Sequence, residues 1–343
     1  MAVDAAFVAL KFLSFSSMSA QLNPPQREAI RYLDGPLLVL AGAGSGKTRV
    51  ITEKVAYLIR DCGLSPSTIA AITFTNKAAR EMQSRIEQLL GGKPEGLTVS
   101  TFHSLGMRIL REEARTLGYK PNFSVFDATD AFGIIADLSG STDKATIRRL
   151  QTQISHWKNA LVSPDAARNA AGSDTEELAA LAYAGYAATL KAYQAMDFDD
   201  LIALPVGLFD AYPETLEKWQ NRLRYLLVDE YQDTNACQYR LLRQLAGTRA
   251  AFTAVGDDDQ AIYGWRGADI ENLRSLPRDY PQLKVIKLEQ NYRSTARILK
   301  AANTLIANNP KLFEKKLWSE LGHGDPIRVT ACKDNEKEAE QVV

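Results

Sequence analysis

The chain has few cysteines, no net charge and no long apolar run. Its three cysteines, Cys62, Cys237 and Cys332, lie far apart and match no metal-binding spacing, so we expect packing residues in a reducing, cytoplasmic compartment. Basic and acidic residues balance at 41 each, so no overall field attracts nucleic acid, and any DNA site must be a local basic and aromatic groove. No apolar segment approaches the length of a membrane span, so no membrane partner is expected.

The first residues carry little pattern. Residues 5–15 are apolar, but the run is short, contains Lys11 and lacks the basic start of a signal peptide. A second methionine, Met18, stands just before the patterned region, and either methionine could be the natural start. We expect residues 1–18 to form a disordered extension.

An apolar run at 37–40 leads into a glycine-rich turn that ends in Gly-Lys-Thr. A strand, such a turn and a helix start together predict a phosphate-binding loop, because bare N–H groups at the positive end of the helix face the anion. Lys47 can reach the β- and γ-phosphates, and the Thr48 hydroxyl can ligate Mg²⁺. The usual pattern opens with glycine, a place that alanine takes here. The predicted loop residues are Ala41, Gly42, Ala43, Gly44, Ser45, Gly46, Lys47 and Thr48.

Two further apolar segments end in acidic residues. The segment 225–228 runs into Asp229, which can hold Mg²⁺, and Glu230, which can deprotonate an attacking water. The segment 251–255 leads to three aspartates and Gln260, which we expect beside the γ-phosphate. Asp229 lies so far downstream of the phosphate loop that one compact nucleotide fold requires an insertion between them.

Aromatic residues follow several of these segments. The sequence Tyr-Gly-Trp-Arg at 263–266 has no apolar periodicity, and its rings could stack DNA bases at roughly 1–3 kcal/mol per base. Phe74 and His103 also follow predicted strands, and ligands of parallel sheets bind at the carboxyl ends of strands. Gln26 precedes the phosphate loop by one short helix. Its amide suits an adenine edge, although alone it would more often be a surface residue.

Strands alternate with helices over most of the chain, which predicts a parallel α/β sheet. From about 105 to 196 the strand signal fades and apolar residues recur at helical intervals, which predicts a helical insertion. The strand pattern returns at 197, and a last strand at 284–288 precedes Gln-Asn-Tyr-Arg-Ser and a helix.

Together these motifs resemble the UvrD/Rep family of superfamily-one DNA helicases. The matching segments, in the family's order from Leu22 to Ser294, are LNPPQREAI, AGAGSGKTRV, TFTNKAAREM, STFHSL, DFDDL, LLVDEYQDTN, VGDDDQAIYGWRGA and LEQNYRS. The resemblance implies an α/β fold: a RecA-like P-loop NTPase parallel sheet with an inserted all-helical domain and the beginning of a second RecA-like lobe. The implied domains are the first lobe at 19–103 and 197–282, the insertion at 104–196, and a truncated second lobe at 283–343.

The resemblance also implies roles for single residues, with ATP and Mg²⁺ bound between the two lobes. Those on the nucleotide are Gln26 reading adenine, Arg49 and Tyr292 flanking its ring, Lys47 and Thr48 on phosphate and metal, Asp229 on the metal, Glu230 as catalytic base, Gln260 as γ-phosphate sensor and Arg293 as arginine finger. Those on single-stranded DNA are Phe74, Tyr263 and Trp265 as stacking residues, with His103 and Arg266 close by.

The family moves 3′ to 5′ along one strand, which implies single-stranded and forked DNA as partners and a role in replication (fork restart) and repair. Replisome or repair proteins, a repair helicase of the UvrD type, and a monomer or a DNA-induced dimer all stay open. Because the family's later motifs are missing, we expect a truncated form with weak or no unwinding. The alternatives are a non-catalytic fragment that binds ATP or DNA, and a small-molecule P-loop kinase, which would not need the Tyr-Gly-Trp-Arg segment.

Overall fold

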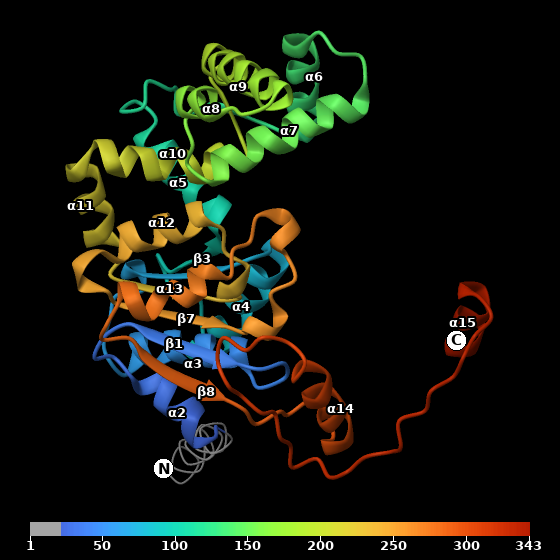
Figure 1. Ribbon diagram of the computed structural model, residues 1–343. Helices are drawn as coiled ribbons and strands as arrows, with labels where there is room; N and C mark the ends of the chain where they lie inside the picture. Colours follow the sequence, from blue (N-terminus) through green and yellow to red (C-terminus); the bar gives the residue numbers. More distant parts are fainter. Residues whose placement is uncertain (1–21) are drawn as a thin grey trace.

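The computed structural model describes residues 22–343, so the extension predicted for residues 1–18 lies outside the described part. Its centre is one six-stranded sheet, with every strand parallel to its neighbours and the order β3-β2-β6-β7-β1-β8 (Figure 1). The strands are β1 (Leu37–Ala41), β2 (Ile69–Thr73), β3 (Thr98–Thr101), β6 (Tyr225–Val228), β7 (Phe252–Gly256) and β8 (Lys284–Leu288). The predicted parallel α/β fold is confirmed.

The central strands are continuous apolar runs because both faces of the sheet are covered. Every residue of β1 is buried, and successive side chains enter different cores: Leu38 and Leu40 one, Leu37 and Val39 the other. The helices over the first core are α5 (Phe102–Glu113), α10 (Asp200–Ala211), α11 (Pro213–Arg222), α12 (Ala236–Ala246) and α13 (Glu271–Asp279). Those over the second are α2 (Pro24–Arg31), α3 (Lys47–Arg60) and α4 (Asn76–Leu90).

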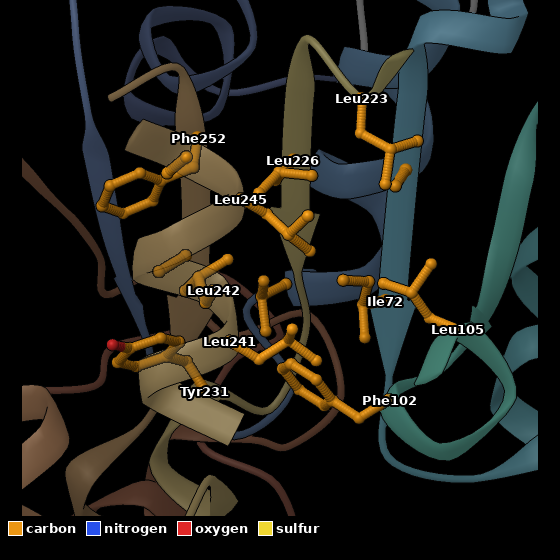
Figure 2. Packing of buried hydrophobic residues seen from close by; sticks show 14 of the residues in the cluster. Ile72, Phe102, Leu105, Leu223, Leu226, Tyr231, Leu241, Leu242, Leu245 and Phe252 are labelled. Atoms are coloured by element: carbon orange, nitrogen blue, oxygen red, sulfur yellow. The ribbon is translucent and has the colours of Figure 1, made fainter. Parts of the chain in front are cut away.

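The first core joins segments that are far apart in the sequence. Figure 2 shows Leu242 and Leu245 of α12 facing Leu226 of β6, with Leu105 of α5 beside Ile72 of β2. This packing joins β2 and α5 to β6 and α12 in one core, although residues 114–224 separate α5 from β6 in the sequence.

The insertion has a core of its own, which includes Ile135, Leu150, Ile154 and Tyr186. Its helices lie beyond α5 and α10 as seen from the sheet (Figure 1). They are α6 (Ala128–Ser139), α7 (Lys144–Asn159), α8 (Pro164–Ala170) and α9 (Asp174–Ala192). One parallel pair, β4 (Ser124–Phe126) and β5 (Ala195–Asp197), interrupts the predicted helical character, because three-residue strands are too short to show a period.

The last strand, β8, pairs with β1 at the edge of the central sheet, so residues 284–288 extend the first sheet. Beyond it lie α14 (Ala296–Ile306) and, set apart at the end of an extended segment, α15 (Asn335–Val342) (Figure 1). After α14 the chain returns to the sheet edge, where Trp318 bridges to Gln290. None of the helices within residues 22–343 combines the length and the apolar character that crossing a membrane requires.

Candidate functional site

The predicted phosphate loop lies between the carboxyl end of β1 and the first turn of α3. Gly44 and Gly46 have φ angles of +70° and +93°, which side chains with a Cβ rarely adopt. The backbone N–H and the hydroxyl of Ser45 both donate to the Gly42 carbonyl, at 3.2 and 2.7 Å, and so tighten the turn. The loop thus presents the amino end of a fourteen-residue helix to an anion.

The acids at the end of β6 lie directly against this loop. Lys47 Nζ forms an ion pair with Glu230 Oε2 at 2.9 Å, and Thr48 Oγ1 lies 3.5 Å from Asp229 Oδ2. Glu230 has a left-handed backbone (φ 49°), and its N–H donates to Asp229 Oδ1 at 3.0 Å. The fold therefore brings the loop lysine to the two acids predicted to face it.

The acids have perturbed proton affinities. Burial, reinforced by the charge of Glu230, raises the pKa of Asp229 to about 7, and the same two causes raise the pKa of Asp233 to about 6. A carboxylate and a hydroxyl are the oxygen ligands that a divalent cation such as Mg²⁺ prefers. Asp229 and Thr48 therefore fit a cation, whose charge would offset the desolvation of the acid.

A glutamine that the sequence analysis passed over connects Glu230 to the predicted γ-phosphate sensor. Gln232 donates to Glu230 Oε2 at 3.0 Å, and its carbonyl accepts the N–H of Asp257 at 2.9 Å. Asp257 in turn accepts a hydrogen bond from the side chain of Gln260. Gln232 stands two residues after Glu230 in the segment DEYQ, and this position could have indicated its role from the sequence.

The segment after β8 lies across the phosphate loop. The Tyr292 N–H donates to the Gly44 carbonyl at 2.9 Å, and Asn291 Nδ2 donates to the Ala43 carbonyl at 2.5 Å. A Cβ added at Gly44 would lie 2.9 Å from Cβ of Arg293. The structure thus places Tyr292 and Arg293 beside the loop, and it adds Asn291, which the sequence analysis did not single out.

The residues predicted for adenine gather on one side of the loop. Gln26 is only 1% exposed, and its amide donates to the Ser45 carbonyl at 2.9 Å and accepts the Asn23 N–H at 3.1 Å. One amide hydrogen and one lone pair therefore remain for a base. Burial raises the pKa of Tyr292, while a hydrogen bond with Asn23 and the charge of Arg49 oppose the rise.

The predicted stacking residues follow β2 and β7, the strands on either side of β6, at the carboxyl edge of the sheet. Phe74 and Tyr263 stack with ring centroids 5.4 Å apart, and Trp265 is 75% exposed. A pocket of about 450 Å³ is lined by both stacked rings and by Glu230 and Gln260. The stacked pair therefore borders the same pocket as Glu230 and Gln260.

One ring of a second aromatic pair, that of Phe198, lines a larger pocket. His103 and Phe198 meet edge to face at 6.1 Å, and burial lowers the pKa of His103. Phe198 and Trp265 line a pocket of about 1060 Å³ that extends along α7 of the insertion. The sequence analysis did not single out Phe198, although it lies between the acids of the DFDDL segment. The side chain of Arg266 lies outside the described part of the structure.

Comparison with known proteins gives matches along nearly the whole chain. The model of the UvrD/REP helicase N-terminal domain matches residues 22–281, and that of the UvrD-like helicase C-terminal domain matches residues 286–343. The chain is 55% identical over 326 residues to ATP-dependent DNA helicase Rep of Escherichia coli strain K12, a match that covers 94% of this chain and 48% of that protein.

A second relative is ATP-dependent DNA helicase PcrA of Staphylococcus aureus strain NCTC 8325, which is 45% identical over 326 residues. That match covers 94% of this chain and 45% of the relative. The chain spans about half the length of the curated relatives it matches. Because both family models match in this order along the chain, the chain belongs to the UvrD/Rep helicase family.

Proposed function

We propose that the chain is the nucleotide-binding part of an ATP-dependent DNA helicase that moves 3′ to 5′ on single-stranded DNA. The observation that carries the proposal is the 2.9 Å ion pair between Lys47 and Glu230 beside a phosphate loop. Glu230 lines the same pocket as the stacked rings of Phe74 and Tyr263. Family membership supports the general helicase activity. The direction of movement is the finer part of the proposal.

ATP would place its phosphates on the N–H groups of the loop, and Lys47 would exchange Glu230 for a phosphate oxygen. Glu230 would then accept a proton from the water that attacks the γ-phosphorus, while the bond to the leaving oxygen of ADP breaks. Thr48 and Asp229 would hold Mg²⁺, which when bound neutralises phosphate charge. Gln260, joined to Glu230 through Gln232 and Asp257, would sense the γ-phosphate.

Residues 283–343 would be the beginning of the second lobe, joined to the first through the pairing of β8 with β1, and residues 104–196 the insertion in the first. Arg293 would act as an arginine finger, a device worth roughly 10³–10⁵-fold in rate. Adenine would lie between Arg49 and Tyr292, with Gln26 at its edge. The hydrogen bonds that the Asn291 side chain and the Tyr292 backbone donate to the phosphate loop support this arrangement.

Single-stranded DNA would stack on Phe74, Tyr263 and Trp265, with His103 and Arg266 close by. The proposal includes forked DNA as a substrate, roles in fork restart during replication and in repair, and replisome or repair proteins as partners. The active form would be a monomer or a DNA-induced dimer. A cytoplasmic location is supported by the three cysteines, all of which are free thiols.

A second candidate is binding of ATP and DNA without unwinding by residues 1–343 alone. The loose packing of α14 favours it, because Leu299 is the buried residue of this helix whereas Ile298 and Leu305 are exposed. Strand-separation assays on a forked duplex distinguish the two candidates, since only the first produces free strands.

Measurements of ATP binding and hydrolysis with and without oligothymidylate test the nucleotide binding that both candidate functions require. The unaltered chain is expected to bind ATP, and a helicase is expected to hydrolyse it faster when DNA is present. Lys47→Ala serves as the matched control, because it removes the phosphate contact and leaves the aromatic residues in place. A chain that binds no nucleotide would contradict the proposal.

A further inference from the structure

Three acids lie side by side at the tip of β7. One carboxylate oxygen from each of Asp257, Asp258 and Asp259 lies within 4.8 Å of the other two, a spacing at which like charges repel strongly. Lys315 Nζ lies among them, 2.6 Å from Asp257, 2.9 Å from Asp259 and in a short ion pair with Asp258. The ammonium fills the place that a cation would take, so we assign no metal to these acids.

The ammonium is enclosed as well as paired. The Lys315 side chain is 4% exposed, and those of Asp257 and Asp258 are equally buried. Burial opposes its charge, but the three carboxylates raise the pKa of Lys315 above its ordinary value. The Phe313 N–H adds a hydrogen bond to Asp258 at 3.3 Å. The buried ammonium of Lys315 and the buried carboxylates around it therefore each keep their charge because the other is present.

Lys315 comes from a different part of the chain than the acids. It lies after α14, in the segment that matches the C-terminal family domain, whereas the acids match the N-terminal one. Two residues further on, Leu317 covers the phosphate loop so closely that a Cβ at Gly42 would lie 2.3 Å from its Cδ2. The ion pairs thus tie the tip of β7 to the segment that closes over the loop.

From the acids a short path of hydrogen bonds reaches the catalytic group. Asp257, held by Lys315, accepts from the Gln260 side chain, and its N–H donates to Gln232, which donates to Glu230. A displacement of Lys315 would leave three crowded carboxylates with no counter-charge. The tip of β7 would then have to move, and Gln260 would move with it.

We propose that Lys315 is a positioning residue that holds residues 257–260, including Gln260, in place for the γ-phosphate. Through Lys315, a movement of the second-lobe segment changes the position of Gln260. The inference rests on the proposed function. It adds a residue that contacts the acids of the β7 tip and acts through them. Its signature is discrimination between ATP and ADP, because only ATP carries the phosphate that Gln260 would meet.

The test compares the affinities of the chain for ADP and for a non-hydrolysable ATP analogue, each with Mg²⁺, by isothermal titration calorimetry. We expect Lys315→Met to lower the ratio of the two affinities by at least about fivefold, the lower end of ordinary coupling between sites, while ADP affinity stays unchanged. Lys315→Arg restores the charge and is expected to restore the ratio. Lys316→Met, at the exposed neighbouring position, is the matched control.

Amide hydrogen exchange over residues 257–263 without nucleotide gives an independent readout, with faster exchange expected in Lys315→Met alone. An unchanged affinity ratio in Lys315→Met would overturn the inference even if exchange rises, because Lys315 would then be merely structural. An equal fall in Lys316→Met would also overturn it. If the unaltered chain binds no nucleotide, the proposed function fails, and exchange alone decides whether Lys315 holds the segment.

Discussion

Burial of the Asp229 carboxylate lowers the free energy of unfolding by an amount that depends on pH. The variant Asp229→Asn removes this pH-dependent destabilisation. Asp229 is 6% exposed, and burial together with the charge of Glu230 raises its pKa from 3.8 to about 7. A shift of about three pKa units corresponds to about 4 kcal/mol, since each unit is worth about 1.4 kcal/mol.

The sign follows from proton binding. Between pH 3.8 and about 7 the folded chain keeps the proton on Asp229 and the unfolded chain loses it, so the free energy of unfolding falls as pH rises and levels off above 7. An asparagine has no such dependence. The stability of Asp229→Asn relative to the unaltered chain should therefore rise by roughly 2–3 kcal/mol between pH 5 and pH 8.

Urea unfolding at several pH values, without nucleotide or metal, measures this difference, and Asp325→Asn at an exposed position is the control. A constant difference between Asp229→Asn and the unaltered chain from pH 5 to pH 8 would refute the reasoning. At pH 7 about half of the Asp229 side chains carry a proton, so loading with Mg²⁺ and ATP should release roughly half a proton, measurable by calorimetry in two buffers. Asp229→Asn should abolish this release.

Three further predictions test the site and the fold. Glu230→Gln removes the proposed base, so ATP turnover should fall by roughly 10²–10⁴-fold with binding retained; an unchanged kcat would exclude this role. Trp265→Ala should weaken single-stranded DNA binding by roughly 1–3 kcal/mol in anisotropy titrations and leave DNA-free ATP turnover intact; unaltered DNA affinity would count against stacking. In Gly106→Ala, the new Cβ would lie 1.8 Å from the Leu201 carbonyl oxygen, so α5 and α10 should separate at a cost of about 1–3 kcal/mol. Gly133 has open space around it, so Gly133→Ala should instead raise the free energy of unfolding by about 1 kcal/mol. Equal effects of Gly106→Ala and Gly133→Ala on stability would contradict the packing argument.

The parallel sheet and the phosphate loop could be predicted because their signals are contiguous in the sequence. The run at 37–40 is apolar throughout since both faces of β1 are covered, and Gly44 and Gly46 stand where the turn needs positive φ. The acids that face the loop follow an equally apolar strand. Such local patterns carry their own physical reason, so a single sequence is enough to find them.

Contacts between distant segments could not be predicted in the same way. Asn291 meets the phosphate loop 248 positions away, and Lys315 meets acids that belong to another family domain. Neither residue stands in a periodic pattern, and a lysine or an asparagine alone is most often a surface residue. The strands β4 and β5 went unnoticed for a related reason, since they are too short to show an alternating pattern.

Linkage between the two ligands is the most direct test of the central claim that one edge of the sheet carries a nucleotide site and a coupled DNA site. The affinity for oligothymidylate is measured with and without a non-hydrolysable ATP analogue, and the affinity for the analogue with and without oligothymidylate. We predict that each ligand changes the affinity for the other by the same factor, as thermodynamic linkage requires. Affinities that are independent of the other ligand would contradict the account.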